Sequence, residues 1–325
     1  ILPSMDEKFP KNRLGLSQWL FDPKNPLTAR VAVNRYWQMI FGKGLVATPD
    51  DFGVQGQLPS HPELLDWLAI SFSENWDVKA LIKKMVLSQT YQQQSVSNPT
   101  LDQKDPENLL LARANAARLP AEIIRDNALK ISGLLNPKIG GESVLPYQPK
   151  GLWKEKNNFS AFLLEYKESQ GEDLYRRGLY TFIRRTSPPP NMVTFDATSR
   201  EVCTVKREVT STPLQALVLL NDPQFFEASR VFAERIINSK NTLEEQISHG
   251  FRLATARHPR ENELEILVDL YNSQYQYFRQ NRDKAYQVIS VGEKPRDKSI
   301  NGAKTAAMTM VANTLLNHDE TYTKR

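Results

Sequence analysis

The stretch of sequence that decides the fold reads TPLQALVLLNDPQFFEASRVFAERIINSK, residues 212–240. It contains two helix starts of the same kind, Thr212-Pro213 and Asp222-Pro223. A short polar side chain accepts hydrogen bonds from the free N–H groups of a first helical turn, and proline suits the first helical position because its φ angle is already set. Apolar residues recur with a helical period after each start, so the stretch predicts two consecutive helices, 213–220 and 223–238.

The same signals continue in both directions along the chain. Residues 26–41 place Val33 and Trp37 on one helical face, and Gly42 follows as a stop. Further helices are predicted over 61–74, after Asp77, after Pro120, and over 243–256, 260–281 and 303–317. Two more Pro pairs, Asn25-Pro26 and Asp105-Pro106, are read as helix starts, and two pairs have capping-box spacing, Ser60 with Glu63 and Thr242 with Glu245.

Helical periodicity fails between residues 137 and 212. The run Gly178 to Thr186 is rich in aromatic and β-branched residues, as strands are, and three prolines follow at 188–190. The segment has too many aromatic residues for a disordered linker. We therefore expect a mainly α, irregular multi-helix domain with a small β or extended insertion in the middle. Its expected parts are an N-terminal helical part, 1–136, an insertion with short strands, 137–212, and a C-terminal helical part, 213–325, in one compact domain.

Composition excludes several classes of protein. The 325 residues are 40% hydrophobic and 24% charged, which excludes collagen, coiled-coil and disordered chains. The single cysteine excludes a disulfide scaffold, a cysteine zinc site and a covalently attached haem. The net charge of +5 comes from basic and acidic residues that alternate along the chain, so we expect no nucleic-acid partner. No apolar run reaches about 18 residues, so we expect no membrane span.

The densest polar cluster lies between residues 184 and 212, in the irregular part of the chain. Long loops held by a helical scaffold often carry function, but arginine–carboxylate pairs also serve to tie such loops to helices. Under this second, network interpretation, an Arg207→Ala change should cause a marked loss of thermal stability. The candidate residues are Arg184, Arg185, Asp196, Arg200, Glu201, Cys203, Arg207 and Glu208.

Other candidates for chemistry are weak. Cys203 has no histidine within forty residues to act as its base, so we expect a buried, inert thiol. His61 lies beside Glu63 and Asp66, but a helix cap explains Glu63 without a metal. The chain contains no phosphate-binding glycine loop and no G-x-S-x-G or H-E-x-x-H sequence. We therefore assign no catalytic residue, no cofactor and no metal site.

Three stretches together resemble a known family. They are residues 25–67, which begin NPLTARVAVNRYW, residues 118–126, RLPAEIIRD, and residues 195–221, which include Asp196, REVC at 200–203, Arg207 and TPLQAL at 212–217. This combination is similar to the C-terminal domain of unknown function, often called the PSD domain, of planctomycete-type cytochrome c domain-containing proteins. The resemblance covers nearly the whole chain.

The resemblance implies a context rather than an activity. Such proteins are large, exported and multi-domain, and they typically carry a cytochrome c-like domain upstream of this one. It implies a location in the periplasm or cell envelope, and haem c only in the upstream domain. The first residues, ILPSMD, fit an internal point of a longer chain. The family has no established activity, so no catalytic residue can be carried over.

These observations leave three hypotheses. The first is a non-catalytic interaction or scaffold domain whose partner is an upstream domain of the same polypeptide or another protein. The second is a hydrolytic enzyme, and the third is a module that binds an anionic ligand or a glycan, both centred on residues 184–208. Pairing of Asp196, Arg200, Glu201 and Arg207 with one another or with the backbone would favour the first hypothesis. Convergence on a pocket with aromatic walls such as Trp153 or Tyr180 would favour the third.

Overall fold

A computed structural model describes residues 2–96, 98–155 and 165–324. The described chain is mainly helical, as the sequence predicts, and it divides into two compact units, unit 1 (1–117) and unit 2 (118–324). The only sheet among the described residues has two strands, β1 (Ala117–Arg118) and β2 (Thr323–Lys324). The structural division falls before the helix that opens after Pro120, because that helix packs within unit 2.

Unit 1 is a small helical unit in which α2 packs on α3 and α4. Its core gathers Val33, Trp37 and Phe41 of α2 with apolar residues of the two other helices. The buried side-chain amide of Asn34 donates to the backbone carbonyl oxygen of Val46 at 3.0 Å and accepts from the backbone N–H of Val46 at 2.9 Å. These two bonds tie the chain after α2 back to that helix. The helices are α1 (Arg13–Leu20), α2 (Thr28–Phe41), α3 (Pro62–Ser73), α4 (Val78–Val86) and α5 (Pro99–Lys104).

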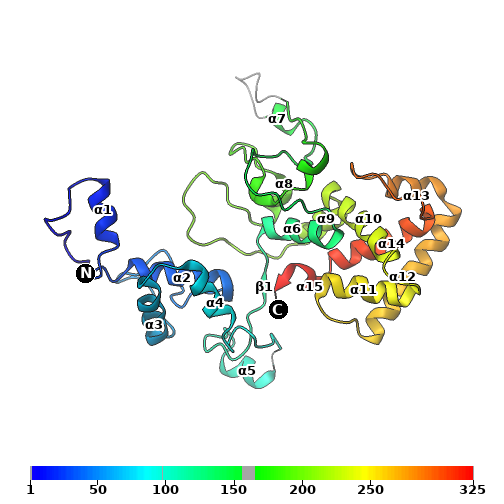
Figure 1. The fold of residues 1–325 in the computed structure, drawn as a ribbon. Coiled ribbons are helices and arrows are strands. Elements are labelled where there is room, and N and C mark those ends of the chain that lie inside the picture. Colours follow the sequence, from blue (N-terminus) through cyan, green and yellow to red (C-terminus); the bar gives the residue numbers. More distant parts are fainter. Residues whose placement is uncertain (1, 97, 156–164, 325) are drawn as a thin grey trace. The chain divides into compact units, whose positions relative to one another are not determined.

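Unit 2 is built around α14 (Gly302–Leu316), which contacts α10, α11, α12 and α13 (Figure 1). A helix that is apolar on all sides belongs in the interior of a bundle, and α14 is buried along most of its length. The surrounding helices are α6 (Ala121–Ser132), α9 (Pro213–Asn221), α10 (Pro223–Ile237), α11 (Leu243–Thr255), α12 (Glu261–Gln280), α13 (Arg282–Ile289) and the short α15 (Asp319–Tyr322).

Most helix starts agree with the predictions, but three of the expected start signals do not. Helix α9 begins at Pro213 as expected, although the Thr212 side chain makes no capping hydrogen bond. Asp222 accepts from the N–H of Gln224, and Thr242 with Glu245 forms the expected capping box. No helix follows Asp105-Pro106, because the Asp105 carboxylate instead accepts two backbone N–H groups of a tight turn, those of residues 109 and 110. The box expected at residues 60–63 is also wrong, since the Ser60 hydroxyl donates to the Leu45 carbonyl oxygen and α3 begins without a side-chain cap.

The middle segment is ordered but contains no strand among its described residues. It consists of α7 (Leu152–Glu155), η2 (Gly171–Tyr175), η3 (Gly178–Tyr180), α8 (Pro190–Thr194) and irregular chain. The run from Gly178 to Thr186, expected to be a strand, begins as a 3-10 turn and makes a single bridge, Val144 with Thr181. Here the tertiary contacts outweigh the β propensity of these residues.

Two buried arginines bind the backbone of the irregular segment, where no sheet provides hydrogen bonds. Arg125 of α6 donates to the carbonyl oxygens of Leu174 at 2.7 Å and Arg176 at 2.6 Å, and to the side chain of Gln224 at 3.1 Å. Arg176 donates in turn to the carbonyl oxygens of Gly140 and Glu142. Both arginines are about 2% exposed, and burial lowers the pKa of Arg125 to about 10. The segment is therefore ordered by charge-assisted bonds to its own backbone.

Arg257 joins the start of α12 to α15. Its guanidinium binds Glu263 at 2.7 Å and Glu320 at 2.7 Å, and the bond from Arg257 lowers the pKa of Glu263 to about 2. The bond to Glu263 should therefore make the stability of the fold depend on pH. Because the pKa of Glu263 is lower in the folded chain than in the unfolded chain, where it is about 4.5, its ionised carboxylate stabilises the fold at pH values above 4.5. This stabilisation is lost as the pH falls from about 4.5 toward 2. We expect Glu263→Gln to cost about 1 kcal/mol at pH 7, allowing for solvent screening, and almost nothing near pH 2. Urea unfolding at several pH values measures this, and a cost that does not change with pH would contradict it.

Candidate functional site

A single carboxylate closes the base of the loop that contains most of the predicted cluster. Asp196 accepts from Arg118 Nη2 at 2.5 Å, from the Thr210 N–H at 2.9 Å and from the Thr210 hydroxyl at 3.0 Å. Arg118 also donates to the carbonyl oxygen of Phe195, and only 9% of its side chain is exposed. Burial lowers the pKa of Arg118, and the Asp196 carboxylate opposes that shift. Asp196 has φ of 61°, a left-handed conformation that aspartate tolerates better than most residues.

A second contact fixes the loop between its ends. The Arg207 guanidinium makes a fork to the Glu122 carboxylate on α6, with N···O distances of 2.7 and 3.1 Å. Burial by itself raises the pKa of Glu122, but the Arg207 hydrogen bond and the nearby charge of Arg200 outweigh it, so the net shift is downward. We call residues 197–211, held by Asp196 and Arg207, the clasped loop.

The remaining candidates lie on the surface or beside an aromatic side chain. Arg184 is half-buried, and its guanidinium lies 5.1 Å from the Trp153 ring centre. Cys203 is exposed, so the expectation of a buried thiol is wrong, because the loop crosses the surface of unit 2 and does not enter its core. The other exposed members are Arg185, Arg200, Glu201 and Glu208.

This arrangement favours a structural role for Asp196 and Arg207, which bind Arg118 of β1 and Glu122 of α6. Arg118, Glu122 and Asp126 belong to one short motif, and each contacts a segment far along the chain, Asp126 through the Gly178 N–H at 2.6 Å. Both oxygens of Glu122 accept from Arg207, and Asp196 is engaged by Arg118 and by Thr210. Carboxylates bonded in this way are poorly placed to exchange protons with a substrate.

The exposure of the Arg207 pair sets the size of its effect on stability. The side chains of Arg207 and Glu122 are 39% and 19% exposed, so the pair is partly solvated. We expect Arg207→Ala to lower the free energy of unfolding by about 1 kcal/mol, because partly exposed pairs contribute little. This is smaller than the marked loss that the sequence suggests. Chemical denaturation measures it with Arg185→Ala as the control, and a loss several times larger would show that the fork is stronger than its exposure implies.

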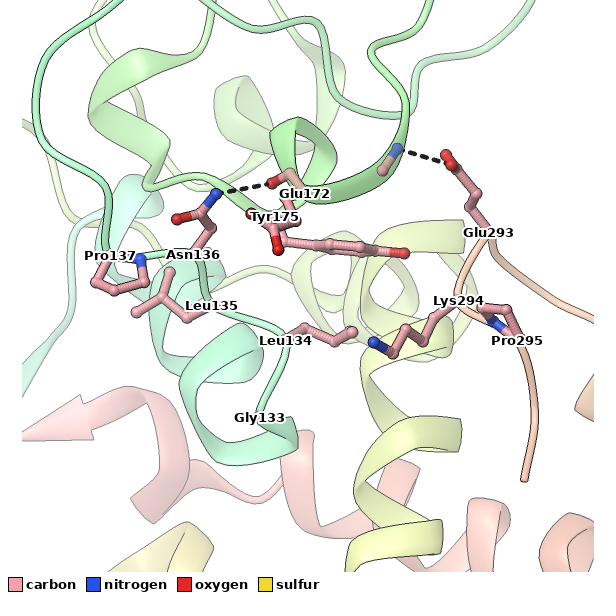
Figure 2. A pocket seen from close by; sticks show the side chains of 11 residues that line it. Gly133, Leu134, Leu135, Asn136, Pro137, Glu172, Tyr175, Glu293, Lys294 and Pro295 are labelled. Carbon is pink, nitrogen blue, oxygen red and sulfur yellow. Dashed lines mark hydrogen bonds between the residues drawn. The ribbon is translucent and has the colours of Figure 1, made fainter.

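A cavity of about 500 Å³ in unit 2 involves none of the predicted residues. Three segments line it: the end of α6 with the chain after it, η2, and the chain after α13 (Figure 2). A hydrogen bond at 2.7 Å, from the Gly171 N–H to Glu293 Oε1, joins two of these walls. The lining residues are Gly133, Leu134, Leu135, Asn136, Pro137, Gly171, Glu172, Tyr175, Glu293, Lys294 and Pro295.

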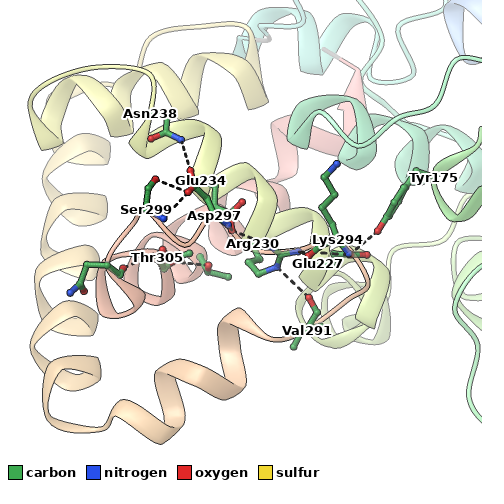
Figure 3. Close-up of polar contacts among 12 residues, drawn as sticks. Tyr175, Glu227, Arg230, Glu234, Asn238, Val291, Lys294, Asp297, Ser299 and Thr305 are labelled. Carbon is green, nitrogen blue, oxygen red and sulfur yellow. Dashed lines mark hydrogen bonds and ion pairs between the residues drawn. The ribbon is translucent and has the colours of Figure 1, made fainter. Parts of the chain in front are cut away.

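A buried charged row on α10 supports one wall of this cavity (Figure 3). Glu227 Oε1 accepts from the Lys294 N–H at 2.7 Å and from the Tyr175 hydroxyl at 2.9 Å. Arg230 donates to the carbonyl oxygens of Val291 at 3.3 Å and Lys294 at 2.5 Å, and Glu234 Oε1 accepts from the Asp297 N–H. We call residues 290–301, between α13 and α14, the strap, and the row on α10 binds its backbone.

The spacing of charged residues in the sequence is a signal for this row. Glu227, Arg230 and Glu234 recur at helical spacing within a helix whose buried residues are mostly apolar, and Glu227 and Arg230 are both 0% exposed. Charged residues are rarely buried without a specific partner. Burial, and then the Glu227 carboxylate, also raise the pKa values of Tyr147 and Tyr175, the two tyrosines beside it.

Comparisons with known proteins place the chain in a family but assign no activity. Residues 12–271 match the family model PSD1, described as a protein of unknown function (DUF1553). This is most of the chain, so the protein belongs to the PSD1 family. No curated protein and no solved structure matches it. Within the described residues, no helix is long and apolar enough to cross a membrane, and no three histidine, cysteine or acidic side chains are grouped to hold a metal ion.

Proposed function

We propose that the chain is a non-catalytic interaction domain and that the clasped loop is its main contact surface. The observation that carries this proposal is a loop fixed at its base by Asp196 and along its length by Arg207, while most of its residues are exposed. Val202 and Val209 on this loop are 73% and 64% exposed. Exposed apolar side chains on a fixed loop favour binding, because little conformational freedom is lost on association.

Neighbouring elements extend this surface. Leu214 and Leu217 of α9 are 57% and 53% exposed, and Val193 of α8 and Ile123 of α6 are nearly half exposed. Helix α8 contacts both α6 and α9, so these side chains belong to adjoining elements. Arg200, Lys206 and Arg207 add positive charge to the loop. Glu201 and Glu208 on the same loop offset Arg200 and Lys206, and Arg207 is paired with Glu122. We therefore expect the partner to present an apolar surface with little net charge.

The wider context is part of the proposal and is supported by the sequence resemblance. The partner is an upstream domain of the same polypeptide or another protein of an exported, cytochrome c-associated assembly in the periplasm or cell envelope. Haem c belongs to the upstream domain, because this chain has one cysteine. The family match supports the coarser statement, membership of a family of unknown function.

The only cysteine of the chain provides the test, because Cys203 is exposed on the clasped loop. The purified chain is labelled at Cys203 with benzophenone maleimide, mixed with an extract of its native host and irradiated. The label should crosslink to one defined protein or domain. The same label on a Val202→Asp/Val209→Asp double variant should lose that crosslink. The matched control is Ile266→Asp on α12, where Ile266 is 65% exposed, and it should keep the crosslink. A crosslink that survives in the loop variant would refute the assignment of this surface.

A ligand-binding module is the second candidate, because one observation favours it. Arg184 lies against Trp153, and the rings of Tyr166 and Phe182 lie 5.0 and 5.9 Å from that tryptophan ring. An arginine among aromatic rings suits an anionic ligand or an acidic glycan. Binding of sulfated or uronate oligosaccharides should then fall in Arg184→Ala and persist in Arg185→Ala. The hydrolytic alternative gains no support from Asp196, whose carboxylate is already engaged.

A further inference from the structure

From the cavity of unit 2 we infer a second binding site, independent of the clasped loop, for a small aliphatic ammonium compound. Its volume of about 500 Å³ lies within the range usual for small-ligand sites. Two carboxylate residues, Glu172 and Glu293, line it against one ammonium residue, Lys294. The cavity therefore has a net negative lining on a chain whose net charge is +5.

The end of α6 contributes backbone to the wall but adds little charge. The helix finishes at Ser132, Gly133 follows it in a left-handed conformation, and Gly133 and Leu134 are part of the cavity wall. The carboxyl end of this helix already has donors, because Arg235 donates to the Ile131 carbonyl oxygen at 2.7 Å and the Gly133 N–H donates to that of Leu129. The negative lining therefore comes from Glu172 and Glu293, whose carboxylates are complementary to an ammonium group and unfavourable to an anion.

The apolar part of the lining suits an aliphatic chain. Leu134, Leu135 and Pro295 line the same cavity, and the ring of Tyr175 lies across it (Figure 2). The side chain of Lys294 extends toward Leu134 in this view, so the cavity already receives one ammonium group on a chain of methylenes. An exogenous alkylammonium compound combines the same two features.

The wall that carries Glu293 and Lys294 is fixed by the buried row on α10. The strap crosses Glu227 so closely that a Cβ on Gly292 would lie 2.1 Å from the Glu227 carboxyl carbon, and Gly292 has φ of 90°. Burying Glu227 and Arg230 costs desolvation, and many of their hydrogen bonds go to the backbone of the strap. Such a network places the rim residues before a ligand arrives, as binding sites require.

Binding of 1,5-diaminopentane to the whole chain tests this inference, with 1,5-pentanediol as the uncharged probe of the same length. Isothermal titration should show saturable binding of the diamine and none of the diol. Glu172→Gln and Glu293→Gln should each weaken binding about threefold to tenfold, since each removes a charge while an amide oxygen can still accept the Gly171 N–H in the second variant. Glu265→Gln, on the exposed face of α12, is the matched control and should bind as the wild type does.

Lys294→Met gives a result that a purely structural role would not produce. It removes the competing ammonium group and keeps the methylenes, so it should strengthen diamine binding, while the backbone N–H to Glu227 remains. The inference is overturned by absence of saturable diamine binding, by equal binding of the diol, or by equal weakening in Glu265→Gln. None of these results bears on the clasped loop, whose test is crosslinking from Cys203.

Discussion

Replacing Arg125 by methionine should lower the free energy of unfolding of unit 2 by about 3–5 kcal/mol, because each buried acceptor left without a donor costs about 1–3 kcal/mol. Arg125 is 2% exposed and donates to two backbone carbonyl oxygens and to Gln224. Methionine fills much of the same volume but donates nothing, so three buried acceptors lose a partner. Guanidinium chloride unfolding, followed by far-ultraviolet circular dichroism, measures the change.

The comparison that isolates this effect uses two further variants. Arg125→Lys keeps the charge but not the fork of donors, so its loss should lie between those of wild type and Arg125→Met. Arg185→Ala removes an exposed arginine and should change stability by less than about 0.5 kcal/mol. If Arg125→Met lost no more than Arg185→Ala, the irregular middle segment would not depend on Arg125.

Replacing Asp196 by alanine should cost about 3 kcal/mol and free the clasped loop, because it leaves the nearly buried Arg118 without its carboxylate. The Thr210 N–H and hydroxyl lose their acceptor in the same variant. Alanine is also strained at the left-handed φ of 61°. The rate of amide hydrogen exchange should therefore rise across residues 197–211. The exchange rates of the α14 amides should keep the same ranking as in the wild type.

Asp196→Asn separates charge from conformation. Asparagine tolerates the left-handed region and keeps one acceptor oxygen, so it should lose less stability than alanine does. Asp269→Ala, at an exposed position of α12, is the control for loss of a carboxylate and should leave loop exchange unchanged. Unchanged loop exchange in Asp196→Ala would show that the loop is held by other contacts.

Local signals predicted the helices well where proline or a capping residue marks the start. The helix after Asp222-Pro223 begins where expected, and α14 corresponds to the helix expected over 303–317. Six helices of the described chain were missed, and each has eight residues or fewer: α1, α5, α7, α8, α13 and α15. The boundary between the two units could not be predicted from the sequence. It depends on the packing of α6 against α10, and no linker-like composition marks it.

The sequence indicated where charged residues are dense, but not which residues they contact. Residues 184–212 were recognised by their density of charge, yet the partners of Asp196 and Arg207 lie 78 and 85 residues away, at Arg118 and Glu122. Spacing along the chain carries no information about such pairs. The cavity was missed for a similar reason, since its three walls come from segments that are separate in the sequence and that show no motif.

The affinity of the clasped loop for the partner crosslinked through Cys203 is the most direct measure of its role as a contact surface. The dissociation constant should be measured for wild type, for the Val202→Asp/Val209→Asp variant and for Ile266→Asp, after circular dichroism shows that all three are folded. We expect the loop variant to bind at least about tenfold more weakly, because two exposed apolar contacts become unpaired charges, and the control to bind as wild type does. Equal affinities for all three proteins would contradict the proposal that this loop is the contact surface.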